Sequence, residues 1–190
     1  MMKAIYNFFT KIRRLFYTGV VHSTVKHCRK NFHIRVLGKV TVRNQNVEIG
    51  NGCTIYQNVI FDGRGKIKIG NNCAIGDNTI IYAAKNVTIG DNTLIAANTY
   101  ILDCNHSTKA DVLICTQPLA YDAGGVAIGN DVWISANCTV GKGARIEDGA
   151  VIGAMSFVNR TIPSNAIAAG APAHVIKYRE GFSQQGEEAD

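Results

Sequence analysis

The sequence has 190 residues, of which 46% are hydrophobic and 18% are charged, a composition typical of one soluble domain. It contains no run of 18 apolar residues, which excludes a sequence-predicted membrane-spanning helix. The net charge of +6 comes from residues 1–47, which hold ten Lys or Arg and no acidic residue, whereas residues 48–190 carry a net negative charge.

Residues 1–38 are predicted to form a basic, amphipathic helical arm. Cations at Lys11, Arg13 and Arg14 alternate with a row of large apolar residues at helical spacing: Ile5, Phe8, Phe9, Ile12, Leu15 and Phe16. The favoured interpretation is that the apolar face packs on the next domain and caps its open end. The alternative is peripheral contact of residues 1–35 with anionic lipid at the inner face of a membrane.

Two other roles for the arm are disfavoured. Nucleic-acid binding would be expected to show a stacking platform or a zinc pattern beside the basic charge, and neither is present. A secretory signal would need an uninterrupted apolar region, which the cations at 11, 13 and 14 break. We therefore expect a cytoplasmic protein.

A six-residue period organises the second half of the chain. Between residues 128 and 163 every sixth residue is aliphatic and β-branched: Ile128, Ile134, Val140, Ile146, Ile152 and Val158. One aliphatic side chain per six residues fits neither an amphipathic helix nor a long alternating strand. The period predicts a coil of very short strands and tight turns, in which each aliphatic side chain stacks above its counterpart in the neighbouring coil.

Upstream, the pattern Ile-Gly recurs every twenty residues, at 49–50, 69–70 and 89–90. Twenty residues are three hexads plus two, so the extra pair is predicted to bulge at a corner near Gly65 and Lys85. The coil domain is therefore predicted over 39–177, with five to six coils. Residues 178–190 are expected to form a polar, disordered tail.

The cysteines are predicted to be free thiols. Cys53, Cys73 and Cys138 occupy the fifth place of a hexad, where a small apolar side chain points inward, and no CxxC pair exists.

The period breaks once, between Ile101 and Val126, which predicts an inserted loop over about 103–125. Long irregular loops in compact repeat domains are usually functional. His106 lies at its start; of the other four histidines, three lie in the arm and His174 lies in the GAPAHVI segment near the end of the predicted coil. From the residues alone, a surface histidine without a function is the default interpretation. Cys104 is an alternative nucleophile because strand alternation would place it on the same face as His106.

The segment IGDN at 75–78 and the run from 126 to 176 resemble the hexapeptide-repeat acyltransferases, and most closely the maltose/galactoside and polysaccharide O-acetyltransferases. The resemblance implies an all-β fold, a left-handed parallel β-helix. It also implies acetyl-CoA as co-substrate, no metal, and a homotrimer with each active site between two subunits.

In that family a histidine in the corresponding loop acts as general base on the acceptor hydroxyl, which the resemblance assigns to His106. Asp103 is a candidate for orienting the imidazole, and a backbone carbonyl would serve equally well. The family's acceptor-binding asparagine has no clear counterpart here. Asn98 and Asn86 are candidate substitutes, and Asn105 and Tyr82 are expected to contact the acceptor as well.

The resemblance also implies a groove for acetyl-CoA. Trp133 falls at an outward-facing place of its hexad, where it either lines this groove or packs against a loop or another subunit. Lys177 and Arg179 are expected to meet the CoA phosphates; the alternative is that they are solvated surface charges. The residues assigned to the groove are Trp133, Ala136, Ala154, Asn159, Arg160, Lys177 and Arg179.

The predicted function is acetyl transfer from acetyl-CoA to a hydroxyl of a sugar or of a surface-polysaccharide precursor. N-acetylation of a nucleotide-linked amino sugar and acetylation of an antibiotic are the alternatives among enzymes. A carbonic anhydrase built on the same coil would need three histidines per zinc, and between residues 39 and 173 the sequence holds only His106. A non-catalytic β-helix that acts as a binding scaffold is the alternative from another class.

Overall fold

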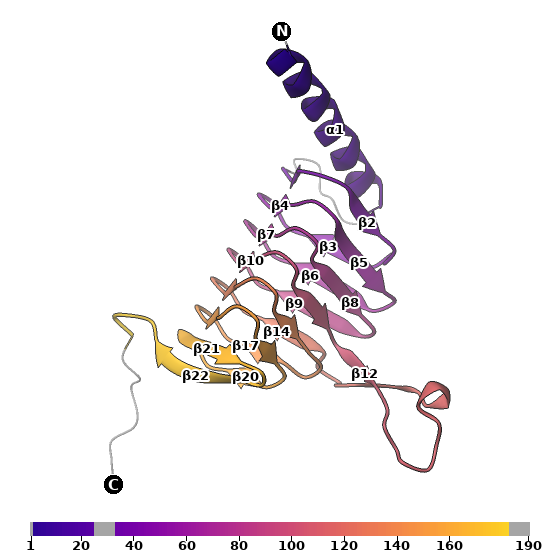
Figure 1. Cartoon of the computed structure of the whole chain (residues 1–190), viewed down its shortest axis with the longest axis vertical. Coiled ribbons are helices and arrows are strands. Elements are labelled where there is room, and N and C mark those ends of the chain that lie inside the picture. The colour runs from indigo at the N-terminus through magenta and orange to yellow at the C-terminus, as the bar shows by residue number, and fades with distance from the viewer. Residues whose placement is uncertain (1, 25–32, 183–190) are drawn as a thin grey trace.

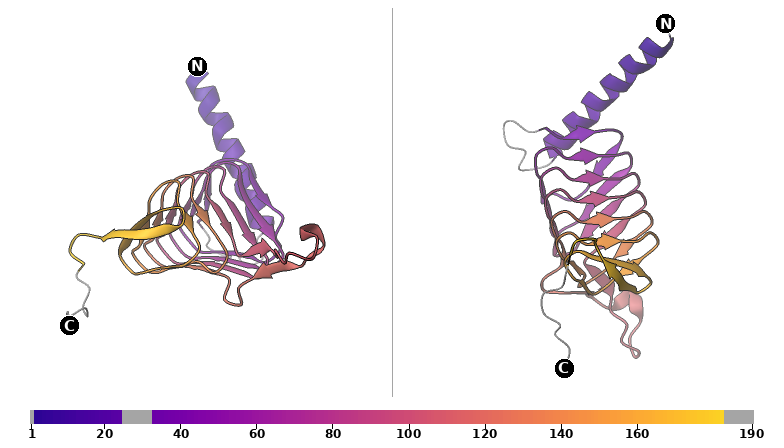
Figure 2. Two further views of the ribbon diagram at one scale, coloured as in Figure 1. Left: turned by 60° about the horizontal axis from the view of Figure 1, so that its bottom comes forward. Right: turned by 90° about the vertical axis from the view of Figure 1, so that its left-hand side faces the viewer.

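The short strands stack into a three-sided parallel coil (Figures 1 and 2). The structure is a computed structural model and describes residues 2–24 and 33–182. Helix α1 (Met2–Thr24) precedes the coil. Sheet A consists of β1 (Arg35–Val36), β4 (Thr54–Ile55), β7 (Ala74–Ile75), β10 (Leu94–Ile95), β15 (Trp133–Ile134), β18 (Val151–Ile152), β21 (Ala166–Gly170) and β22 (Ala173–Tyr178).

Two six-stranded parallel sheets form the other faces. Sheet B contains β2 (Val40–Val42), β5 (Val59–Gly63), β8 (Ile80–Ala83), β11 (Tyr100–Leu102), β16 (Thr139–Val140) and β19 (Phe157–Val158). Sheet C contains β3 (Val47–Ile49), β6 (Lys66–Ile69), β9 (Asn86–Ile89), β14 (Val126–Ile128), β17 (Arg145–Ile146) and β20 (Thr161–Ile162). The chain passes from A to B to C in each coil, so we name the edges between the faces AB, BC and CA.

The six-residue period is confirmed as the basis of the core. All six aliphatic residues from Ile128 to Val158 are at most 3% exposed, and each lies in register with its counterpart in the neighbouring coil. The predicted corner bulges are also confirmed, because Gly65 and Lys85 lie in the bends between sheets B and C.

The coil is longer than the sequence predicted. Seven strands of sheet A run parallel, one per coil, where five to six coils were expected. The domain begins at Arg35 rather than at residue 39, because β1 pairs in parallel with β4. The Ile-Gly pair of this first coil stands at its end, at 49–50, and no such pair precedes β1 twenty residues earlier, so the start of the coil was not recognised.

Asparagines in the left-handed conformation turn the AB edge. Asn58, Asn78 and Asn98 have φ between 57° and 59°, and their side-chain amides form a ladder with N to O distances of 3.1 Å. A short polar side chain tolerates this conformation better than other non-glycine residues. Asn98 therefore has a structural role as the last member of the ladder.

Helix α1 contacts the coil near β1 and β2 and extends away from the end of the coil (Figure 1). Tyr17 is the helix residue packed against the core. The predicted packing of the apolar row on the coil is wrong, because its six side chains, Ile5 through Phe16, are 47–66% exposed. Among the described helices, none is long and apolar enough to cross a membrane.

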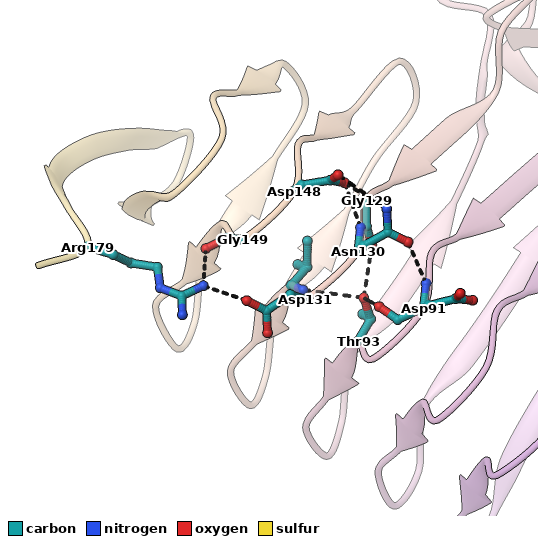
Figure 3. A network of polar contacts seen from close by, with 9 residues as sticks. Asp91, Thr93, Gly129, Asn130, Asp131, Asp148, Gly149 and Arg179 are labelled. Atoms are coloured by element: carbon teal, nitrogen blue, oxygen red, sulfur yellow. Dashed lines mark hydrogen bonds and ion pairs between the residues drawn. The ribbon is translucent and has the colours of Figure 1, made fainter. Parts of the chain in front are cut away.

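At the other end, β21 and β22 form an antiparallel hairpin that folds back on sheet A. Arg179 fastens the chain after this hairpin, as its guanidinium donates to Asp131 Oδ2 at 2.8 Å and to the carbonyl of Gly149 at 3.0 Å (Figure 3). The predicted tail from residue 183 onward lies outside the described residues.

Candidate active site

The inserted loop is a hairpin that leaves the coil at the BC edge (Figure 2). Its antiparallel strands are β12 (Cys104–His106) and β13 (Leu119–Tyr121), and a 3₁₀ turn, η1 (Ile114–Thr116), lies in the connection. The Lys85 ammonium stands 4.6 Å from the centroid of the Tyr121 ring, which ties the base of the hairpin to the preceding coil.

Asp103 has a different environment from the one predicted. Its buried carboxylate accepts hydrogen bonds from the backbone N–H groups of Ala84, Lys85 and Asn86, at 2.6 to 2.7 Å. No hydrogen bond joins Asp103 to His106 in the described part of the chain. Because both carboxylate oxygens are used at the corner of the preceding coil, Asp103 fixes the point where the hairpin leaves the coil.

His106 is exposed on β12 and opens onto a pocket of about 440 Å³, a size typical of small-ligand sites. The strand pairing of His106 with Leu119 holds its backbone in place. Within the described residues the imidazole has no hydrogen-bond partner, so it is free to meet a ligand. The pocket is lined by Asn105, His106, Ser107, Thr108, Lys109, Ala120 and Lys142.

Cys104 is a poor candidate for the nucleophile. It is only 5% exposed, while His106 is exposed, so the two do not share an accessible face. Burial raises the pKa of the Cys104 thiol, and the negative charge of Asp103 adds to this effect. A thiol with a raised pKa carries little of the reactive thiolate at neutral pH.

The predicted free thiols are confirmed for the five cysteines that the structure describes. Cys53, Cys73 and Cys138 are buried in the core, as expected, and Cys115 is exposed in η1. Cys28 lies outside the described residues. The described part of the chain contains no group of three or more His, Cys, Asp or Glu side chains arranged to hold a metal ion.

Tyr82 and Asn98 do not line the pocket. Tyr82 lies half-buried on the outer face of sheet B, in register with Asp62 and Leu102. Beside it, Tyr100 has a raised pKa, chiefly because of burial and then because of Cys104, Tyr82 and Asp62. Asn98 lies at the AB edge, away from the edge that carries the hairpin.

The residues predicted to bind CoA lie on several parts of the prism. Trp133 faces outward, as predicted, and is 51% exposed between Leu94 and Val151 of the neighbouring strands. The others lie at three edges and in the C-terminal hairpin: Ala136 and Ala154 at AB, Asn159 and Arg160 at BC, Arg179 at CA, and Lys177 in β22. One chain therefore does not gather them into a single groove.

Sequence reasoning missed Lys109 and Lys142. Lys142 belongs to the turn after β16, one coil beyond the hairpin, and Lys109 to the hairpin itself. The only available signal was the sequence GKG at 141–143, which marks a turn but not its neighbours.

Two family models match the chain. Residues 125–160 match the bacterial transferase hexapeptide (six repeats), and residues 66–103 match the hexapeptide repeat of succinyl-transferase. Curated relatives include a chloramphenicol acetyltransferase of Morganella morganii, 49% identical over 57 residues, which are 30% of this chain and 27% of that protein. The galactoside O-acetyltransferase of Escherichia coli is 46% identical over 52 residues, which are 27% of this chain and 26% of that protein. The chain thus matches about a quarter of the length of these relatives.

Among solved structures, the coil is similar to a mutant of AntD, an N-acyltransferase from Bacillus cereus, in complex with dTDP-4-amino-4,6-dideoxyglucose and coenzyme A. The TM-score is 0.67 at 22% identity, covering 86% of this chain and 89% of that one. The likeness shows a shared fold, and the repeats match family models on both sides of the inserted hairpin. The chain therefore contains hexapeptide repeats of the kind that these family models describe, and its coil has the fold of a parallel β-helix.

Proposed function

We propose that the protein is an acetyl-CoA-dependent O-acetyltransferase that acts on a hydroxyl of a sugar or of a polysaccharide precursor. The observation that carries this proposal is His106, an exposed imidazole at the mouth of a ligand-sized pocket. Imidazole is the side chain best able to take a hydroxyl proton near neutral pH. The relatives named as acetyltransferases support the same chemistry.

The proposed mechanism is direct transfer between two bound substrates. His106 takes the proton of the acceptor hydroxyl while the oxygen attacks the thioester carbonyl. The resulting tetrahedral oxyanion is stabilised by backbone N–H groups and collapses, the C–S bond breaks, and the CoA thiolate leaves and takes up a proton. Asn105, beside His106 in the pocket, is the candidate contact for the acceptor.

We propose a homotrimer in which a second subunit completes the site. The distribution of Trp133, Asn159, Arg160 and Lys177 over different faces supports this arrangement, because a groove between two prisms can use different faces of each. The exposed apolar tip of the hairpin, Val112 to Ile114, also favours a neighbouring subunit.

The experiment that tests the function is a screen of acceptors with acetyl-CoA, following release of the free CoA thiol. Sugars and glycan fragments should release thiol, and the product should carry an ester. An amide product on an amino sugar would support the N-acetyltransferase alternative, and turnover with chloramphenicol alone would support the antibiotic alternative. If CoA neither raises the melting temperature nor is released, the chain is a scaffold rather than an enzyme.

We further propose that the protein is cytoplasmic and that α1 binds the inner face of a membrane. The apolar row of α1 is exposed, and Tyr17, the residue that packs on the coil, lies about 120° around the helix from Ile5. Packing on the coil therefore leaves the apolar face uncovered. The four cations and no acid in the helix sequence favour anionic lipid over a second, equally basic copy of the helix.

Vesicle sedimentation tests this proposal. Full-length protein should sediment with vesicles that contain phosphatidylglycerol, and less so at high salt because screening weakens the attraction. The double substitution Phe8→Asp and Phe16→Asp should reduce binding by more than tenfold, because each buried Phe contributes about 1.5 kcal/mol or more. Tyr56→Asp, at an exposed aromatic on the coil, should leave binding unchanged. Absence of binding by the wild type at low salt would contradict the membrane role.

A further inference from the structure

The pocket at His106 has an unbalanced positive charge. Lys109 and Lys142 both line it, and none of its lining residues is a carboxylate. Neither lysine takes part in an ion pair with another described residue. The ion pairs among the described residues are Arg43–Asp62, Glu48–Lys66 and Asp131–Arg179. The two ammonium groups thus lack a protein counter-charge.

The acids nearest in sequence do not neutralise the pocket. Asp103 is buried, and its carboxylate accepts hydrogen bonds from three backbone N–H groups at the corner of the preceding coil. Asp122 approaches the turn at Gly143 without lining the pocket, and Asp111 is exposed in the hairpin connection. Neither Asp111 nor Asp122 lies within ion-pair distance of the two pocket lysines.

Both lysines extend from ordered backbone. Lys142 is half-buried in the turn after β16, where the N–H of Ala144 bonds the carbonyl of Gly141 at 3.1 Å. The backbone of Lys109 is held by the side chain of Gln117, which accepts from its N–H at 2.9 Å and donates to its carbonyl at 3.0 Å. The positive charge is therefore placed on one side of His106 by the coil and on another by the hairpin.

We infer that the acceptor is an anionic sugar, whose phosphate or carboxylate binds Lys142 and Lys109 while one of its hydroxyls meets His106. The inference rests on the proposed function and names the substrate class of the same site. Lysine ammonium groups bind such anions as point charges, and two of them beside one pocket add their attraction. Ser107 and Thr108 supply hydroxyls that can bond the other sugar oxygens.

Because the anion binds away from the reacting hydroxyl, its contribution should be similar in the ground state and the transition state. Loss of a lysine should therefore raise KM more than it lowers kcat. A lysine needed only for the structure of the hairpin would instead lower kcat on every acceptor alike.

The test compares galactose, galactosyl phosphate, galacturonate and its neutral methyl ester as acceptors for the full-length protein. The wild type should prefer the charged acceptors in kcat/KM by tenfold or more. If galactosyl phosphate has the higher kcat/KM, the group bound is a phosphate; if galacturonate has it, the group bound is a carboxylate. Lys142→Gln should reduce this preference about tenfold through KM, with kcat within twofold. Lys68→Gln, at an exposed lysine on sheet C, should behave as the wild type.

Calorimetric binding of galactosyl phosphate and galacturonate separates this inference from the proposed function. Binding of either anion that weakens about tenfold in Lys142→Gln and in Lys109→Gln, without thiol release on any acceptor, would contradict the acetyltransferase but support the anion site. Equal use of charged and neutral acceptors by the wild type, or binding insensitive to both substitutions, would overturn the inference. Melting temperatures close to that of the wild type show that the variants are folded.

Discussion

Replacement of His106 by alanine is expected to lower kcat by about 10² to 10⁴-fold, because the acceptor hydroxyl then loses its general base. The affinity for CoA should change by less than about 1.4 kcal/mol, a factor of ten, since the residues proposed to bind CoA are untouched. The rate of thiol release measures kcat, and calorimetric titration with CoA measures the affinity for CoA.

Two variants control for this result. His33→Ala removes an exposed histidine at the start of the coil and should leave kcat unchanged. Cys104→Ala should keep most of the activity, because the buried thiol takes no part in the transfer. Wild-type turnover by His106→Ala would contradict the assignment, as would activity that a chelator abolishes and zinc restores.

Replacement of Asp103 by alanine is expected to lower the free energy of unfolding by about 3 kcal/mol or more. It leaves the N–H groups of Ala84, Lys85 and Asn86 without their acceptor, and each hydrogen bond to a charged group contributes about 1.5–3 kcal/mol. Urea unfolding followed by circular dichroism measures the loss. Asp122→Ala, at an exposed carboxylate next to the same hairpin, should change stability little.

The same variant distinguishes the two roles considered for Asp103. If Asp103→Ala has wild-type stability but a displaced pH–rate profile, Asp103 orients the imidazole as the sequence suggested. If stability falls and the shape of the pH–rate profile of the remaining folded enzyme is unchanged, the carboxylate acts only by fixing the hairpin.

Stacking explains why so much of the coil was predictable. Each coil repeats the same contacts, so Ile134 and Ile152 must be alike to pack in register, and the sequence shows this directly. The start of the first coil was missed because Val36 and Val40 pack there with no Ile-Gly pair before them in the sequence.

The site was less predictable because its geometry depends on contacts between the hairpin and the neighbouring coils, and the six-residue period carries no information about these contacts. Asp103 is near His106 in sequence, yet its partners lie 17 to 19 residues earlier, on the preceding coil. Lys142 lines the pocket together with residues of the hairpin, although it lies one coil further along the chain. The helix was predictable from its apolar spacing, whereas its uncovered face depends on Tyr17 being the residue that contacts the coil.

The central claim is that acetyl passes directly from CoA to the acceptor at His106, and initial-rate kinetics test it most directly. With acetyl-CoA and the best acceptor varied together, double-reciprocal plots should intersect, and protein mixed with acetyl-CoA alone should carry no covalent acetyl group by mass spectrometry. Parallel plots together with an acetyl-protein, modified at Cys104 or Cys115, would contradict direct transfer and assign the chemistry to a thiol.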